Sequence, residues 1–223
     1  MKHWRTEWMA TKSNIALKLA QGDCGAGYAE SVIILCSAIS AVAAELWPGK
    51  RKDRARFIEL IVHSTPSSGR LVSVPLLLEI LKGEGRTQEI QLLNDQLGRF
   101  QETRVLTSED IDLKEEEVFA SVPNLSLKAV RSCSYANLLY DEIRSSYVHQ
   151  YDPGNRANPW PMSSRKTSPA SYVNVLNRPR EIHFHVEWLA NIAHQAAVFA
   201  DGLPSVPLTD PDSWWIHGEP GNL

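Results

Sequence analysis

The sequence predicts a mainly α-helical protein, a helical bundle with a small β-hairpin near its C-terminal helix. Apolar residues recur at intervals of three and four in most segments, which is the spacing of one face of a helix. Pro-Gly pairs and isolated glycines separate these segments and supply helix ends. The alternation of apolar and polar residues that is typical of strands is confined to residues 172–186.

Composition indicates a single domain. The chain has 223 residues, of which 43% are hydrophobic, and this suffices for a substantial core. We expect one domain over residues 1–223, with a loop and β-hairpin insertion at 152–185 and a C-terminal tail at 203–223. The loop part of the insertion is rich in Pro, Gly, Ser and Arg, as long functional or unstructured connections are.

Charge and cysteine content limit the function classes. The net charge is −3 and the isoelectric point is about 6.2, so the chain lacks the global basic field of strong nucleic-acid binders. Contact with RNA would need a local basic patch. The three cysteines are odd in number and contain no C-x-x-C pair, which argues against a disulfide framework or a zinc ribbon and favours a reducing cytosol.

Targeting signals are not evident in the sequence. The N-terminus lacks the apolar region of a signal peptide, and the most apolar run, residues 31–44, is shorter than the ~20 residues that a bilayer requires. We therefore expect this run to be a buried core helix, and the protein to be cytoplasmic with no membrane contact.

The first half of the chain predicts a series of helices. The first two form a helical hairpin, because Gly22 breaks the chain after one and Pro48-Gly49 ends the other. Pro75 lies in a first turn, where proline is tolerated. The acidic stretch 101–124 is a connector with at most short helices. The expected helices cover residues 3–20, 28–47, 50–64, 72–83 and 87–100.

The helix at 50–64 begins with a dense run of basic residues. Its apolar residues face inward, which pushes the basic side chains outward or toward a cleft. This run is the best local candidate for RNA binding, and a solvated face that balances nearby acids is an equally good interpretation. The candidate residues are Arg51, Lys52, Arg54 and Arg56.

Residues 125–152 are the stretch around which the chain is organised. They contain no Pro or Gly and predict one long helix with a stop at Pro153-Gly154. One stripe of this helix is expected to be buried, because its members recur at alternating intervals of three and four. These members are Cys133, Ala136, Tyr140, Ile143 and Tyr147.

Two polar rows run along the other side of this helix toward its end. One row holds Arg144 and the other holds His149, and five residues separate these two, so their directions differ by ~140° on an ideal helix. They share a face only if Arg144 curls round the helix or the last turn distorts. Cations near a helix C-terminus are also ordinary, because they complement the macrodipole. Other polar members of these rows are Asp141, Glu142, Ser145 and Tyr151.

The end of the helix carries a motif. The segment Arg144-Ser-Ser-Tyr-Val-His149-Gln-Tyr151 has the pattern R-x4-H-x-Y, followed by an acidic residue and a turn. This resembles the signature of the HEPN superfamily, all-α domains found in nucleases of toxin–antitoxin, CRISPR and phage-defence systems. The version with Tyr two residues after the His is similar to HEPN toxins that are paired with nucleotidyltransferase antitoxins. The pattern departs from many active members at Ser145, where Asn, Asp or His is common.

This resemblance implies a HEPN-like bundle and a metal-independent endoribonuclease without a cofactor. His149 would be the acid/base, since an imidazole exchanges protons readily near neutral pH, and Arg144 would clamp the phosphate with its two-pronged guanidinium. The implied partners are RNA, a second copy of the chain whose motif faces the first, and an antitoxin or nucleotidyltransferase. In toxins of this kind the partner attaches AMP to the residue that matches Tyr151. The supporting site residues would be Asp141, Glu142 and Ser145.

An alternative function is a catalytically silent HEPN-like module that binds RNA or a protein, and Ser145 favours it. A helical protein with no such ancestry is a third hypothesis. A metal site at His183, His185 and His194 lacks a clear fourth ligand and the acid of an H-E-x-x-H motif, so we expect no metal. The sequence also lacks Walker, G-x-G-x-x-G and G-x-S-x-G patterns.

The C-terminal part completes the fold. Residues 186–199 predict a helix that ends at Asp201-Gly202. Three basic residues of the loop could reach a phosphate near His149, and the two tryptophans of the tail are expected to dock on the chain's own core or on a second subunit. The basic residues are Arg156, Arg165 and Lys166, and the tryptophans are Trp214 and Trp215.

Overall fold

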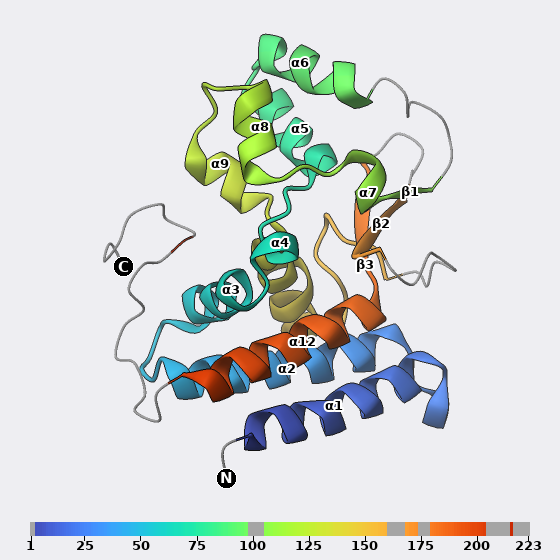
Figure 1. Cartoon of the computed structure of the whole chain (residues 1–223). Helices are drawn as coiled ribbons and strands as arrows, with labels where there is room; N and C mark the ends of the chain where they lie inside the picture. Colours follow the sequence, from blue (N-terminus) through green and yellow to red (C-terminus); the bar gives the residue numbers. More distant parts are fainter. Residues whose placement is uncertain (1–2, 98–104, 160–167, 174–178, 204–214, 216–223) are drawn as a thin grey trace.

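The mainly helical class is confirmed by the computed structural model of the chain, which describes residues 3–97, 105–159, 168–173, 179–203 and 215. The helices enclose a buried hydrophobic core, and a small sheet lies at one side of them (Figure 1). Arg165, Lys166 and Trp214 lie outside the described residues.

Three long helices form the base of the fold in Figure 1. Each of them packs against the other two, and α3 packs on two of them. Their bounds match the expected segments within a few residues. The helices are α1 (Trp4–Ala20), α2 (Tyr28–Leu46), α12 (Val186–Gly202) and α3 (Asp53–Ser64).

The apolar run at 31–44 is a core helix, as expected. Helix α2 contacts α1, α3 and α12 as well as the motif segment, and its small residues Ala38 and Ala43 are buried where these helices approach. Among the described helices, α2 alone is long and apolar enough to cross a membrane by length and composition, and half of that stretch is buried inside the fold. The cytoplasmic location stays a prediction.

Shorter helices form the upper part of Figure 1. The acidic connector contains short helices, as expected, and Pro75 lies in the first turn of its helix. The elements there are α5 (Val74–Gly83), α6 (Thr87–Leu97), α7 (Ser108–Ile111), α8 (Glu115–Ser121) and α9 (Leu127–Ser132). Helix α4 (Pro66–Gly69) lies between them and α3 in the figure, and a 3₁₀ turn η1 (Asp23–Gly25) follows α1.

The predicted hairpin is present and gains a third strand. Strand β2 (Ala170–Val173) pairs antiparallel with β3 (Glu181–Phe184), with Tyr172 opposite Ile182. Strand β1 (Leu106–Thr107) adds to the other edge of β2 and gives the order β1-β2-β3. β1 was not predicted, because a strand of two residues has no periodicity to detect.

The prediction of one long helix over 125–152 is wrong. Helix α9 ends at Ser132, and the chain resumes as α10 (Tyr135–Leu138), a π-helix η3 (Leu139–Ser145) and α11 (Ser146–Gln150). The break has a tertiary cause, because the backbone around Ser134 pairs with Val72: Ser73 N donates to Cys133 O at 2.9 Å, and Tyr135 N donates to Leu71 O at 2.9 Å. The Ser134 side chain then caps α10 by accepting from Asn137 N.

The buried stripe of this segment is confirmed for most of its members. Cys133, Ala136, Ile143 and Tyr147 are buried, whereas Tyr140 is partly exposed. The π-helix widens the turn that leads into the motif, and Arg144 and Ser145 are its last two residues. Helical segments of this kind are rare and occur often at functional sites.

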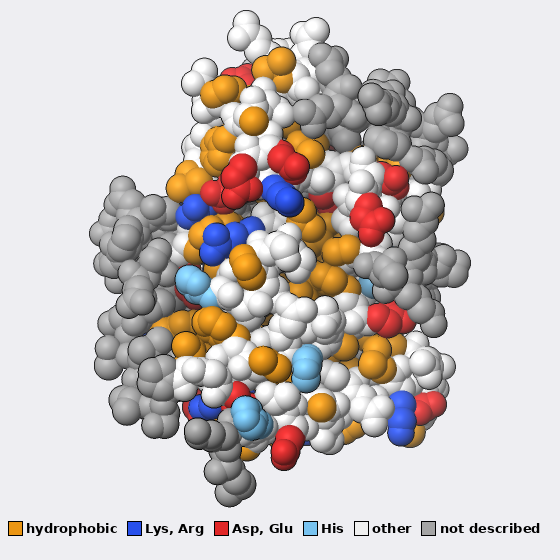
Figure 2. Space-filling model, in the orientation of Figure 1, with side chains coloured by type: hydrophobic (Ala, Val, Ile, Leu, Met, Phe, Trp, Pro, Cys, Tyr) orange, Lys and Arg blue, Asp and Glu red, His pale blue; other side chains and the backbone are white. Residues whose placement is uncertain are grey.

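Trp215 is buried against its own chain, which is one of the two expected positions for this residue. The Trp215 ring lies 4.4 Å from the guanidinium carbon of Arg131 and 5.8 Å from that of Arg70, and Arg131 also donates to the Trp215 carbonyl. Arg131 pairs with Glu115 at 2.9 Å. Figure 2 accordingly shows basic and acidic side chains next to one another around α9 and α4.

Candidate functional site

The motif residues lie on η3 and α11, which pack against α2. Arg144 points onto α2: its Nε lies 3.3 Å from Ser40 Oγ, and its Nη1 lies 3.4 Å from the Tyr140 hydroxyl. The guanidinium carbon is 5.2 Å from the centre of the Tyr140 ring, within the range of a cation–π contact. Arg144 is partly buried in this position.

Arg144 has no carboxylate partner among the described residues. Its contacts are two hydroxyls and a ring, none of which neutralises its charge. Several other arginines among the described residues do pair with a carboxylate. Those that pair with a carboxylate are Arg5, Arg54, Arg56, Arg86, Arg131 and Arg156.

His149 is exposed on α11 and makes no hydrogen bond or ion pair within the described part of the chain. No contact joins it to Arg144 there. The π-helix ends at Ser145, and the chain from Ser146 to His149 is ordinary α-helix. The π-helix therefore does not bring Arg144 and His149 onto the same side of the helix. One chain therefore presents a guanidinium and an imidazole in diverging directions.

Tyr151 ends the motif helix. It adopts the left-handed conformation, with φ 57°, and its side chain is 59% exposed. Its hydroxyl donates to Glu30, and this hydrogen bond raises the pKa of Tyr151 and lowers the pKa of Glu30. Glu30 also accepts from Gly27 N at 2.7 Å, so Tyr151 is tied to the start of α2.

Glu142 holds the chain that follows the motif. Its carboxylate is buried and accepts from Arg156 Nε at 2.7 Å and Arg156 N at 3.1 Å, while its carbonyl accepts from Gly154 N at 2.7 Å. A Cβ on Gly154 would collide with the Glu142 carboxylate and lie 3.0 Å from Glu142 Cα, so this close approach requires glycine. Glu142 is two residues from Arg144, and residues at this spacing do not face each other.

Asp141 is engaged by the basic segment. Arg54 Nε donates to its carboxylate at 3.0 Å, Asn137 Nδ2 donates at 3.1 Å, and Arg54 also contacts the Asn137 side-chain oxygen. Ser145 is partly buried and forms no side-chain hydrogen bond among the described residues. Of the expected supporting residues, Asp141 thus pairs with Arg54 near Tyr140, and Glu142 pairs with Arg156.

The other basic candidates have varied surroundings. Arg56 pairs with Asp53 and donates to the carbonyls of Trp47 and Gly49, both at 3.3 Å. Arg51 is exposed, and Lys52 directly precedes α3. RNA binding by these four residues stays a prediction, although Arg54 does reach the motif segment.

Ser40 and Tyr140 are the contacts that the sequence did not reveal as part of the site. Tyr140 was assigned to the buried stripe, yet its position four residues before Arg144 places the two side chains next to each other. Ser40 lies 104 residues away on α2, and nothing in the local pattern connects it with the motif.

A second polar cluster lies between β2, α10 and the start of α5. Asp112 accepts from the hydroxyls of Tyr135 and Tyr172 and from Val74 N, the last two at 2.7 and 3.2 Å. The one phenolic proton of Tyr172 goes to the carboxylate, so Ser73 donates to the Tyr172 oxygen at 2.8 Å. Burial raises the pKa of Asp112 to about 7.

The two histidines of β3 and its end take part in buried hydrogen bonds. Nδ1 of His183 donates to the Asn158 carbonyl at 2.8 Å, and Nδ1 of His185 donates to the Ser168 carbonyl at 2.6 Å. Nε2 of His185 then accepts from Ser171 at 2.8 Å. Burial lowers the pKa of His183 to about 4. Among the described residues no three His, Cys, Asp or Glu side chains form a metal-binding group.

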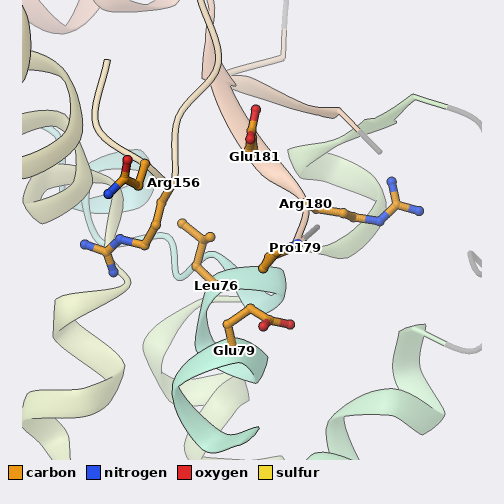
Figure 3. Close-up of a pocket in the computed structure, with 7 residues that line it drawn as sticks. Leu76, Glu79, Arg156, Pro179, Arg180 and Glu181 are labelled. Carbon is orange, nitrogen blue, oxygen red and sulfur yellow. The ribbon is translucent and has the colours of Figure 1, made fainter. Parts of the chain in front are cut away.

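A cavity of about 280 Å³ lies on the Arg156 side. Figure 3 shows the Arg156 guanidinium turned away from Leu76, which agrees with its pairing to Glu142. The cavity is separate from the Arg144 contacts, because neither Arg144 nor Ser40 nor Tyr140 lines it. Its lining residues are Leu76, Glu79, Asn155, Arg156, Pro179, Arg180 and Glu181.

Comparisons with known proteins add no relative: no family model, no curated protein and no solved structure matches this chain. The resemblance to HEPN domains therefore rests on the R-x4-H-x-Y pattern.

Proposed function

We propose that this protein is a metal-independent endoribonuclease of HEPN type, with Arg144 and His149 as its catalytic residues. The observation that carries the proposal is the state of these two side chains. Arg144 is a partly buried cation without a carboxylate partner among the described residues, and the nearby His149 imidazole is exposed and unengaged there. A partly buried arginine with a structural role would normally be paired, since an uncompensated buried charge is costly.

The proposed reaction is cleavage of RNA by its own ribose. The 2′-oxygen forms a bond to the adjacent phosphorus while the bond from phosphorus to the 5′-oxygen breaks. The 2′-hydroxyl proton passes to a base and a proton passes to the leaving 5′-oxygen, so the products are a 2′,3′-cyclic phosphate and a 5′-hydroxyl. His149 moves one of these protons, and Arg144 stabilises the charge that develops on the phosphoryl oxygens.

A second copy of the chain would complete the site. Arg144 and His149 diverge within one chain, whereas a symmetric dimer can place His149 of one copy beside Arg144 of the other. Val148 and Tyr151 flank His149 and are 45% and 59% exposed. These side chains supply apolar surface at the helix end for such a contact.

The experiment that tests this function is cleavage of total RNA by the pure protein in EDTA. We expect fragmentation that persists in EDTA and falls roughly a hundredfold or more in His149→Ala, the range for a general acid/base. Gln150→Ala, an exposed neighbour on α11, is the matched control and should cleave normally. Cleavage that EDTA abolishes and His149→Ala retains would place the site elsewhere. RNA binding without cleavage would favour the catalytically silent module.

A further inference from the structure

The hydrogen bonds around Arg144 leave hydroxyl protons without acceptors. A guanidinium can only donate, so Ser40 Oγ and the Tyr140 oxygen both accept from Arg144. Each hydroxyl keeps its own proton, and neither donates it to another group among the described residues. The remaining N–H groups of Arg144 likewise have no acceptor there. The cluster thus has N–H and O–H groups from two elements that meet no acceptor among the described residues.

The charge of this cluster is also uncompensated. Two acids, Asp53 and Asp141, lie close enough to act on Tyr140. Each already pairs with another arginine, Asp53 with Arg56 and Asp141 with Arg54. The Cys36 thiol lies under Arg144 but remains neutral, because burial raises its pKa to about 12. Burial likewise raises the pKa of Tyr140, so its phenol keeps the proton that it would donate. The cluster is therefore a positive, donor-only site at the surface of α2 and η3.

We infer that Ser40 and Tyr140, together with Arg144, form a binding site for the oxygens of a phosphate group. A phosphate supplies what the cluster lacks, because its oxygens only accept hydrogen bonds and carry negative charge. The guanidinium fork matches two phosphate oxygens, and the two hydroxyls flank it from α2 and from the preceding helical turn.

In RNA this site would hold the scissile phosphate, and this part of the inference rests on the proposed function. As the 2′-oxygen bonds to phosphorus, negative charge grows on the oxygens that are not being transferred. Donors fixed in advance around those oxygens stabilise the transition state more than the ground state. Ser40 and Tyr140 thereby join Arg144 as groups that touch the reacting phosphate, while His149 handles the protons.

Phosphate binding can be tested without RNA. The shift in melting temperature with inorganic phosphate, against chloride at equal ionic strength, reports binding to the folded state. We expect Ser40→Ala and Tyr140→Phe each to weaken phosphate binding about tenfold, the range for one hydrogen bond to a charged group. Two matched controls should bind normally: Ser37→Ala on the exposed face of α2, and Tyr147→Phe, whose hydroxyl meets no partner among the described residues.

The same four variants should then be assayed on RNA with one non-bridging phosphate oxygen replaced by sulfur. We expect the wild type to be slowed by one stereoisomer, and Ser40→Ala or Tyr140→Phe to lose part of that slowing, because the lost donor faced the replaced oxygen. If Ser40 and Tyr140 only positioned Arg144, the slowing by sulfur would be the same in the variants as in the wild type. That result would overturn direct contact between these hydroxyls and the phosphate.

The two proposals fail separately. If phosphate binding depends on Ser40 and Tyr140 but the protein cleaves no RNA, the phosphate site is supported and the ribonuclease function is refuted. If RNA cleavage depends on His149, while Ser40→Ala and Tyr140→Phe cleave RNA and bind phosphate normally, the ribonuclease function is supported. The phosphate site at Ser40 and Tyr140 is then refuted.

Discussion

The Asp112 cluster and the Arg144 cluster both contain an ionisable group surrounded by hydroxyls. The two clusters differ in how many of their donors and acceptors have partners. Asp112 accepts from two phenols and a backbone N–H, and a serine donates to one of the phenols. Around Arg144, donors face two hydroxyl oxygens and the hydroxyl protons have no acceptor among the described residues.

This difference separates a structural network from a candidate site. A closed network, in which each donor meets an acceptor, strengthens the fold and needs nothing from outside. An open, partly exposed cluster in which only donors are left over can take its acceptors from a ligand as well as from water. By this criterion the Asp112 cluster stabilises the sheet against α5 and α10, and the Arg144 cluster is available for function.

The largest expected effect is the loss of stability when the closed cluster is broken. Asp112→Ala leaves two phenols and a backbone N–H without their acceptor and should lower the free energy of unfolding by roughly 3 kcal/mol or more. Arg144→Ala should change it by less than about 1 kcal/mol, because no ion pair is lost. Urea denaturation of both variants measures this. Equal destabilisation by Asp112→Ala and Arg144→Ala would mean that Arg144 has a structural role, and would refute the distinction between the two clusters.

The closed cluster should also make stability depend on pH. The pKa of Asp112 is about 7 in the fold against 3.8 ordinarily, so between these pH values the folded protein holds a proton that the unfolded chain lacks. Its stabilising contribution is full below about pH 4 and is lost as pH rises toward 7. The whole shift corresponds to about 4 kcal/mol.

The measurement is the unfolding free energy of the wild type and of Asp112→Asn from pH 4 to 8. Other groups titrate alike in both proteins, so the difference between the two curves isolates Asp112. A difference that stays constant across this range would refute the prediction.

The open cluster should be shared between two chains if the site is dimeric. Arg144→Ala and His149→Ala, each inactive alone, should recover up to about a quarter of wild-type cleavage when mixed and refolded together. Half of the dimers are then mixed, and each mixed dimer has one intact pair. Sedimentation of the same samples shows whether they are dimers. Two inactive variants that remain inactive as a mixed dimer would show that each site uses residues of one chain.

Tyr151 should give the smallest effect on the protein alone. Tyr151→Phe removes one exposed hydrogen bond to Glu30 and should leave stability and RNA cleavage near normal. If a nucleotidyltransferase silences the protein by attaching AMP to Tyr151, the bulky anion would compete for Arg144, and the Phe variant should escape. The test is to co-express the protein with a nucleotidyltransferase encoded next to it and to measure the intact mass, which an attached AMP would increase. A wild type that stays unmodified, or a Phe variant that is still silenced, would contradict it.

Much of the fold could be predicted from periodicity and breakers. The long helices α1, α2 and α12 follow from apolar spacing and end at Gly or Pro-Gly, and the hairpin follows from alternation. The break at Ser134 could not be predicted, because its cause is a bridge to Val72, 62 positions earlier in the chain. Strand β1 was missed for a similar reason, since pairing with β2 alone defines it.

The candidate site shows the same division. Arg144, His149 and Tyr151 were found because they form one short pattern on one helix. Ser40 comes from another helix, and only the packing of η3 on α2 brings it to Arg144. The π-helical turn and the engagement of Asp141 by Arg54 are likewise consequences of tertiary contacts.

The most direct test of the central claim, that the unpaired Arg144 serves an RNA phosphate, is the rate of cleavage of a defined RNA oligonucleotide in EDTA. Arg144→Ala should lower this rate roughly a hundredfold or more, as loss of a charge-stabilising donor does. Arg144→Lys, which keeps the charge but not the fork, should fall between the two. The wild-type product should carry a 2′,3′-cyclic phosphate. An Arg144→Ala protein that is folded and cleaves at the wild-type rate would contradict the account.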